Sequence, residues 1–191
     1  MFKPNPPTPL LPDGKWNRTY RLGRVMGLTI SADTTAILGA FAFWAVIAVL
    51  GKELLGLTGP DVVVGGWLLV LLHYGSGIVH QFGHALAAAQ TGYEMTGIHF
   101  WLILTQSIYP PNEPKLPAKI HIQRAKGGPI ASTVLAGILG ILSLLLIPVG
   151  GLVLYIVVFL FLDNLLLFTV GAFLPFSFTD GGTFKEWRGK P

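Results

Sequence analysis

The sequence predicts an all-α membrane protein with about four transmembrane helices. Of the 191 residues, 52% are apolar and 12% are charged, which is about half the charged share of an ordinary soluble domain. The apolar residues gather in four runs, and membrane-crossing helices are expected at about 34–50, 62–90, 129–149 and 152–174. A hydrocarbon core of about 30 Å takes about 20 helical residues to cross. A lipid bilayer is therefore the expected surrounding of most of the chain.

The distribution of lysine and arginine predicts the orientation of these helices. Cytoplasmic loops of membrane proteins retain positive charge. With the N-terminus inside, only Lys52 of the 13 basic residues falls in an outer loop. The sequence therefore predicts a multi-pass integral protein with both termini in the cytoplasm. A prokaryotic inner membrane is the expected location. The formal net charge of +4 is too small and too dispersed for a basic face that binds nucleic acid, so no nucleic-acid partner is expected.

A proline-rich, basic arm, residues 1–33, precedes the first span. It is expected to stay on the mature protein, because the first apolar run comes late and has no small-residue cleavage site. Within the arm, residues 24–31 alternate loosely between polar and apolar side chains and predict a short strand or extended entry at the membrane surface. The membrane-embedded domain is expected at 34–182, and residues 183–191 are expected to form a short cytoplasmic tail.

The loop between the second and third spans, residues 91–126, is unusually long. Long loops in compact proteins are commonly functional or disordered. Residues 98–104 are rich in aromatic and β-branched side chains, which is typical of a strand or a re-entrant segment, and a proline-rich stretch follows. We interpret this loop as a lid or platform on the cytoplasmic side. The Pro-Val-Gly-Gly stretch at 148–151 predicts a tight turn that joins the third and fourth spans into a hairpin.

A pair of histidines stands at the inner end of the second span. His80 and His84 are four residues apart, so both lie on one helical face and can reach a single metal ion. The chain has no cysteine, so any further ligand must be His, Asp or Glu. Asp180 is the best candidate, because the predicted topology returns it to the side of the membrane where the histidines lie. The alternative is a chance spacing of packed histidines, since the pair lacks its usual middle Glu.

Three more polar side chains fall within the apolar spans. His73 lies two turns before His80 on the same helical face, and Asp163 and Asn164 lie near the middle of the fourth span. They are candidates for contacts behind the metal ligands or for a proton path. The alternative is a neutral, buried Asp163, hydrogen-bonded to His73 or Asn164, that helps the helices to associate. His99 and His121 are expected at the surface or at an interface, with no functional role.

Three motifs together resemble the site-2 protease family of intramembrane zinc metalloproteases. They are His80-Gln-Phe-Gly-His-Ala-Leu-Ala-Ala-Ala89, Gly127-Gly-Pro-Ile-Ala131 and Leu174-Pro-Phe-Ser-Phe-Thr-Asp-Gly-Gly182. The resemblance implies a site-2 protease-like core in which His80, His84 and Asp180 hold zinc. It also implies hydrolysis of peptide bonds in membrane proteins near the cytoplasmic face.

Two positions depart from the pattern of that family. Gln81 stands where the family has the Glu that acts as general base, and a neutral amide cannot take a proton from water. Ala172 stands where the family usually has an Asn that can orient a substrate or an oxyanion. We therefore expect very slow catalysis or none. The sequence leaves open whether Gln81 is natural or introduced, although the second departure favours a natural change.

Three functions therefore remain open. The first is an impaired membrane metalloprotease that acts on transmembrane protein substrates. The second is a non-catalytic pseudoprotease that serves as a subunit, assembly factor or regulator of a larger membrane complex, with Trp16, Trp101 and Tyr109 as docking residues. The third is a pigment or haem protein in which His73 or His80 is an axial ligand.

Overall fold

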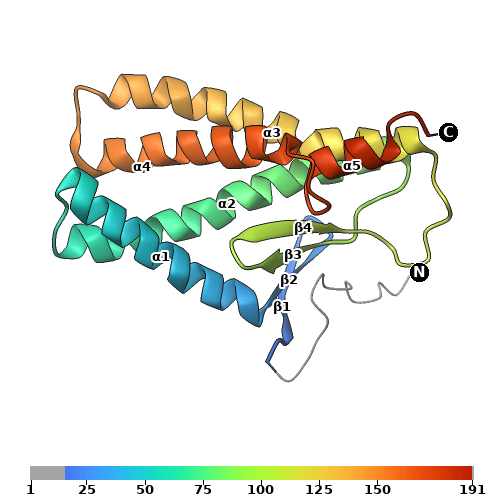
Figure 1. Ribbon diagram of the computed structural model, residues 1–191, viewed down its shortest axis with the longest axis horizontal. Helices are drawn as coiled ribbons and strands as arrows, with labels where there is room; N and C mark the ends of the chain where they lie inside the picture. Colours follow the sequence, from blue (N-terminus) through green and yellow to red (C-terminus); the bar gives the residue numbers. More distant parts are fainter. Residues whose placement is uncertain (1–15, 191) are drawn as a thin grey trace.

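The computed structural model describes residues 16–190, which are mostly helical (Figure 1). Four helical segments are long and apolar enough to cross a membrane: α1 (Thr34–Leu55), α2 (Pro60–Thr91), α3 (Ala118–Leu146) and Gly151–Phe173. The last consists of α4 (Gly151–Leu162), a π-helical stretch (Asp163–Val170) and a 3₁₀ turn (Gly171–Phe173), and a short helix, α5 (Asp180–Trp187), follows. Residues 1–15 of the predicted arm lie outside the described residues.

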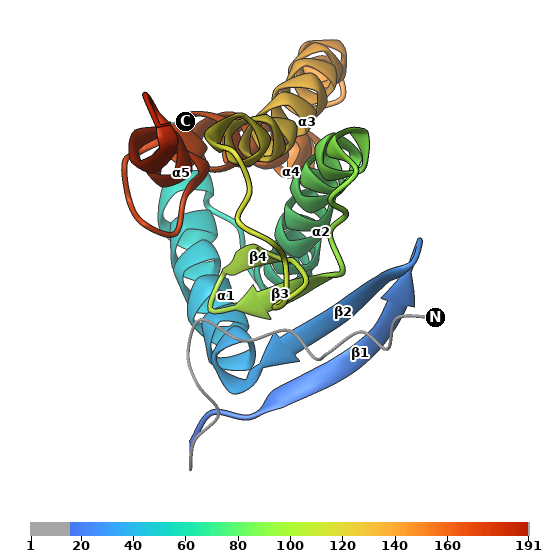
Figure 2. The same ribbon diagram turned by 90° about the vertical axis from the view of Figure 1, so that its right-hand side faces the viewer.

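The all-α prediction is wrong in one respect, because a four-stranded sheet accompanies the helices. The strands are β1 (Thr19–Val25), β2 (Leu28–Asp33), β3 (Gly97–Trp101) and β4 (Leu104–Ile108), in that spatial order. β2 and β3 are parallel, and the other neighbours are antiparallel. The single strand expected at 24–31 is a hairpin, since the backbone reverses at Met26 and Gly27, both with positive φ. Figure 2 shows this hairpin extending away from the helices.

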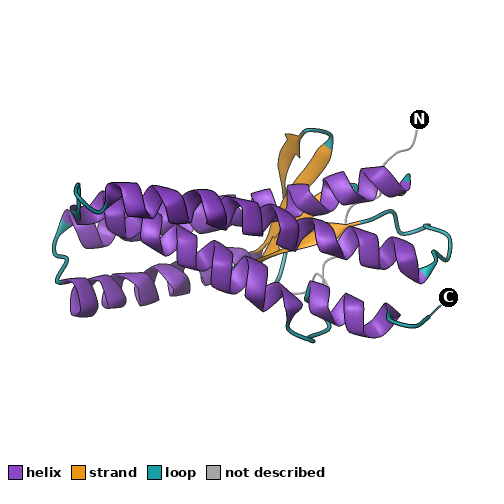
Figure 3. Cartoon of the chain, turned by 90° about the horizontal axis from the view of Figure 1, so that it is seen from above, coloured by secondary structure: helices purple, strands orange, loops and turns teal. Residues whose placement is uncertain are grey.

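The sheet packs against one half of the helical bundle (Figure 3). Its inner face and α2 share an apolar cluster that includes Ile30, Ile98, Phe100 and Ala88. Because β2 runs directly into α1 and β3 follows α2, this cluster joins the entry of the first helix to the exit of the second. The same packing holds β4 beside α2, where the histidine pair lies.

The outward faces of the helices are apolar. Only 17–33% of each most apolar 18-residue window is buried inside the protein, and large aliphatic side chains such as Leu38, Leu71 and Leu145 are exposed. Exposed apolar area of this extent is costly in water and matches the hydrocarbon of a bilayer. The protein is therefore an integral membrane protein.

Two glycine-dependent contacts fix the helical arrangement. Gly150 and Gly151 both have φ near +64°, which glycine adopts without strain, and they form the predicted turn between α3 and α4. Gly83 of α2 lies directly against Gly127 of α3, so a Cβ on either residue would collide with the other backbone. Small residues allow such close approach of membrane helices. The crossing brings the beginning of α3 beside the histidines of α2.

Helix α3 begins earlier than hydropathy predicts, at Ala118 rather than near residue 129. The added turns carry Lys119, Arg124 and Lys126, and their charge conceals the helix from an apolarity argument. The loop between α2 and α3 is correspondingly shorter, and residues 97–108 of it form the β3–β4 hairpin.

Candidate metal centre

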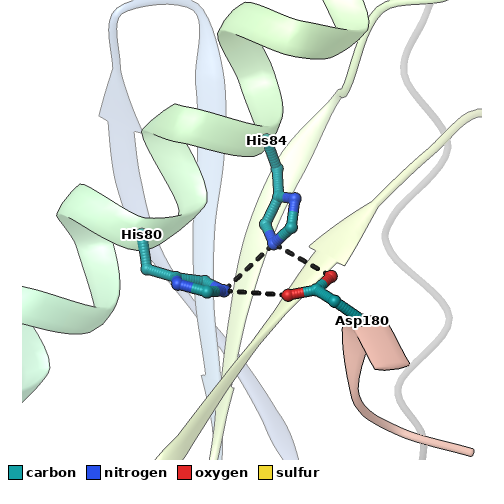
Figure 4. A group of neighbouring side chains, drawn as sticks. All are labelled: His80, His84 and Asp180. Atoms are coloured by element: carbon teal, nitrogen blue, oxygen red, sulfur yellow. Dashed lines mark hydrogen bonds and ion pairs between the residues drawn. The ribbon is translucent and has the colours of Figure 1, made fainter. Parts of the chain in front are cut away.

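The structure brings together three side chains from distant parts of the chain. His80 and His84 are buried on α2, and Asp180 is the first residue of α5. The two Nε2 atoms are 3.1 Å apart, and each lies 3.4 Å from one oxygen of the Asp180 carboxylate. Figure 4 shows both rings and the carboxylate pointing toward a common space. The three residues therefore form a group that could hold one metal ion.

Each imidazole is oriented through its other nitrogen. His84 Nδ1 lies 2.9 Å from the carbonyl oxygen of Arg124, and this contact requires a proton on Nδ1. The backbone nitrogen of Gly128 is 3.3 Å from the same atom, but the shorter contact with the carbonyl decides the tautomer. His80 Nδ1 lies 2.9 Å from the hydroxyl of buried Ser132. Hydrogen bonds of this kind leave Nε2 free to bind a metal.

The spacing of these atoms fits a small divalent ion. Zinc bonds of about 2.0–2.1 Å at tetrahedral angles place neighbouring ligand atoms about 3.3 Å apart, close to the separations of His80, His84 and Asp180. Gly128 provides room, because a Cβ there would overlap both Nε2 atoms. Two His and one Asp leave a further position open, which is typical of a catalytic rather than a structural zinc site.

Asp180 reaches the group because the chain turns sharply after the fourth apolar helix. Thr179 caps α5 by accepting a hydrogen bond from the Gly182 amide, and Gly181 lies against the backbone of Phe173, where no side chain would fit. Burial acts to raise the pKa of Asp180, but the imidazoles of His80 and His84 beside the carboxylate outweigh it and leave the pKa lowered. The carboxylate is therefore ionised at neutral pH.

The side chain of Gln81 extends from α2 to strand β4 and is hydrogen-bonded there. Its Nε2 donates to Thr105 Oγ1 at 3.1 Å, and its Oε1 accepts from Ser107 Oγ at 2.6 Å. The side chain is almost completely buried, and both ends of the amide are engaged by strand β4. The amide thus joins β4 to the histidine-bearing helix.

A cavity of about 610 Å³ opens beside these residues. Its walls include His80, His84 and Asp180, which we call the metal-type group, together with Gln81 and strand β4. Apolar side chains that follow the fourth apolar helix, among them Leu174, Phe176 and Phe178, complete the lining. β4 is the last strand of the sheet, so its outer backbone edge has no neighbouring strand among the described residues. An unpaired edge beside a cavity can hydrogen-bond an extended polypeptide.

Comparison with known proteins supports the fold. The sequence matches no family model and no curated protein. Among solved structures, it is similar to the site-2 protease from Methanocaldococcus jannaschii, with 19% sequence identity and a TM-score of 0.58. The match covers 87% of this chain and 69% of that one.

The chain has the site-2 protease fold. At this level of identity the comparison establishes architecture, and the chemistry has to be argued from the residues of this chain. Ala172 lines the cavity but has no hydrogen-bonding side chain. Asn164, the nearest amide along the chain, is fully buried, and its Nδ2 donates to Ser76 Oγ and to the Leu160 carbonyl. Asn164 is not among the residues that line the cavity.

His73 and Asp163 form a separate pair two turns along α2. His73 Nδ1 lies 3.0 Å from Asp163 Oδ1, and its Nε2 lies 2.7 Å from the carbonyl oxygen of Ile103. Both side chains are buried, as the interpretation of a helix-associating pair requires. Phe168 connects the pair to the metal-type group, because its ring lies 5.3 Å from that of His73 and 5.6 Å from that of His80.

Arg124 is a site residue that sequence reasoning missed. Its buried guanidinium makes two hydrogen bonds to Glu113, at 2.5 and 3.0 Å, and one to the carbonyl of Tyr93. It also lies 4.1 Å from the centre of the Tyr109 ring. These contacts fix the carbonyl that orients His84. The available signal was Glu113, an acid that stands among the basic residues of the second half of the loop.

Two expectations about surface residues need correction. His99 is fully buried on β3, where its Nδ1 lies 3.0 Å from Ser31 Oγ, so the expectation that it lies at the surface or an interface is wrong. Tyr109 lines the cavity beneath Arg124, and burial is the largest cause that raises the pKa of its hydroxyl to about 12. It is therefore not an exposed docking residue. His121 is half-buried and stacks on Trp187.

Proposed function

We propose that this protein is a membrane metalloprotease-type protein that binds zinc through His80, His84 and Asp180, and that peptide hydrolysis is lost or strongly reduced because of Gln81. The observation that carries the proposal is the convergence of two Nε2 atoms and a carboxylate beside Gly128. Two imidazole nitrogens with free lone pairs at 3.1 Å repel each other unless a cation or a proton lies between them.

Each element of the site has a role in this proposal. Bound zinc would polarise a peptide carbonyl and acidify water. Ser132 and Arg124 orient the imidazoles, and the outer edge of β4 aligns an extended segment of a transmembrane protein along the cavity. Gln81 can donate and accept hydrogen bonds, but it cannot accept the proton that hydrolysis releases.

A second function is favoured by the hydrogen bonds of Gln81. Because Thr105 and Ser107 engage both ends of its amide, Gln81 stabilises the position of β4 without contributing a base. A pseudoprotease that holds a membrane segment as a subunit, assembly factor or regulator needs the cavity and not the base. Trp16 remains a candidate docking residue because it is 87% exposed, whereas Trp101 packs against Phe178.

The haem or pigment hypothesis is weaker. Both ring nitrogens of His73 contact protein oxygens, and His80 Nε2 faces His84 and Asp180. His73 therefore has no nitrogen left for an axial bond, and His80 Nε2 shares its space with two further candidate ligands, which fits a small ion better than a planar macrocycle.

Elemental analysis of the full chain, purified from native membranes, tests the metal site first. We expect about one zinc per chain, and loss of that zinc in His84→Ala, because removal of one of three protein ligands opens the site. A folded protein without metal would contradict the zinc proposal for both functions.

Gln81→Glu then separates the two functions. If the base is the missing part, the variant should cleave synthetic single-span transmembrane peptides at least about a hundredfold faster than the parent protein. Mass spectrometry would identify the new peptide ends, and Gln81→Glu with His84→Ala is the control. A zinc-loaded Gln81→Glu variant that cleaves nothing would favour the pseudoprotease.

A further inference from the structure

A second hollow lies between the beginning of α3 and the end of α5, away from the metal-type group. Its volume is about 490 Å³. We call it the lysine groove, and it is lined by Ala118, Lys119, Ile122, Gln123, Lys126, Trp187, Gly189 and Lys190. Three of these residues are cationic and none is acidic. Neither proposed function uses the lysine groove.

The α3 wall of the groove is a single helical stripe. Lys119, Ile122, Gln123 and Lys126 stand at positions i, i+3, i+4 and i+7, which share one face of a helix. The two lysines are exposed, and the isoleucine and glutamine between them are half-buried. This stripe presents one ammonium group on each side of the Gln123 amide.

Trp187 forms the opposite wall and is held in place. Its ring stacks on His121 of α3, with ring centres 4.0 Å apart and planes inclined by 10°. Lys190 Nζ lies 4.9 Å from the centre of the Trp187 ring and 3.9 Å from a carboxylate oxygen of Glu186. Glu186 balances one lysine, so Lys119 and Lys126 leave the groove with a net positive charge.

The position of the groove along α3 places it at the surface of the bilayer. The 29 residues of α3 extend over about 43 Å, whereas the hydrocarbon core is about 30 Å thick. The uncharged part, from Gly127 to Leu146, accounts for about 30 Å by itself. Lys119 and Lys126 therefore lie at the depth of lipid headgroups, where tryptophan is also enriched.

We propose that the lysine groove binds the phosphate of an anionic phospholipid headgroup. Ammonium groups bind phosphate as point charges, and the tryptophan ring and Ile122 border the glycerol region. A phosphate held by Lys119 and Lys126 beside Trp187 bridges α3 and the end of α5. Since α5 begins at Asp180, this bridge also holds the helix that carries Asp180 against α3.

Native mass spectrometry of the full chain, with added phosphatidylglycerol or phosphatidylcholine of matched acyl chains, tests the proposal. We expect a preference for phosphatidylglycerol that falls about thirtyfold in Lys119→Gln/Lys126→Gln, because a lysine near an anionic surface contributes about fivefold in affinity. The matched control is Lys115→Gln/Lys185→Gln, which removes the same charge from exposed lysines outside the groove. It should lose less than about threefold.

The outcomes decide both the site and the source of the phosphate. Equal binding of the two lipids, or equal losses in the two double variants, would overturn the groove in favour of diffuse charge attraction. Glycerol 3-phosphate at millimolar concentration should not displace the lipid if the membrane is the source. Displacement by glycerol 3-phosphate would instead assign the groove to a free phosphate compound. Circular dichroism checks that each variant remains helical.

Discussion

Helix α2 carries two buried histidine groups that differ in their hydrogen bonds. At His73, both ring nitrogens contact protein oxygens, one on Asp163 and one on Ile103. At His80 and His84, only the Nδ1 atoms are engaged in this way, and the Nε2 atoms face each other and Asp180. The first arrangement joins helices and the β3–β4 hairpin. The second leaves two Nε2 atoms facing a carboxylate, an arrangement that could hold a metal ion, so the same residue type on one helix stands in two different environments.

Filling the space beside the Nε2 atoms of His80 and His84 should have the largest effect on zinc binding. We expect Gly128→Ala to abolish zinc binding, because the added methyl group overlaps the Nε2 atoms of His80 and His84. Gly137→Ala is the matched control on the same helix, since nothing lies within 4 Å of its added Cβ. Elemental analysis of both variants gives the result. Full zinc content in Gly128→Ala would show that the ion binds elsewhere.

Removing Asp163 from its pair with His73 should reduce the stability of the fold and leave zinc binding unchanged. We expect Asp163→Ala to lower the free energy of unfolding by about 3–5 kcal/mol, because a buried partner is left unpaired. The double variant His73→Leu/Asp163→Leu should recover most of this loss, since it leaves neither polar group buried. Thermal unfolding in detergent measures both values. Zinc loss in Asp163→Ala, at temperatures where the variant stays folded, would mean that the two groups are not independent.

Removing an orienting contact should have the smallest effect. Ser132→Ala deletes the hydroxyl that lies 2.9 Å from His80 Nδ1, and we expect zinc affinity to fall about 10- to 100-fold. Ser143→Ala is the control, because Ser143 is also buried on α3 but donates to the Leu139 carbonyl. Competition with a zinc chelator measures the two affinities. Equal affinities in the two variants would show that Ser132 only packs against the ring.

Local sequence patterns were informative where one helix supplies the feature. The 3.6-residue period places His80 and His84 on one face, and the glycine pair at residues 150 and 151 predicts the turn between α3 and α4. The Asp163 contact with His73 was also among the alternatives that the sequence offered. These features depend on neighbours within a helix or on the cost of a buried charge, and both can be evaluated without the fold.

Features that depend on pairing between distant segments were missed or incomplete. The parallel pairing of β2 with β3 joins strands that all of α1 and α2 separate, and a short alternating pattern gives no information on such a partner. The polar first turns of α3 conceal its beginning. The burial of His99 and the contacts of Arg124 with Glu113 depend on how the loop folds back over α2, which no periodicity specifies.

The sequence by itself determined that this is a membrane protein with four apolar helices, two histidines on one helical face and no carboxylate at position 81. Composition, helical period and residue chemistry are sufficient for these conclusions. The predicted topology also indicated that Asp180 lies near the histidines, and the structure brings the three side chains together. Only the tertiary structure decided that β4 lines the cavity and that Thr105 and Ser107 engage Gln81. The physical reason is that these contacts depend on segments far apart in the sequence. They arise from the close crossing of α2 and α3 at Gly83 and Gly127, and from a sheet in which β1 and β2 precede α1 whereas β3 and β4 follow α2.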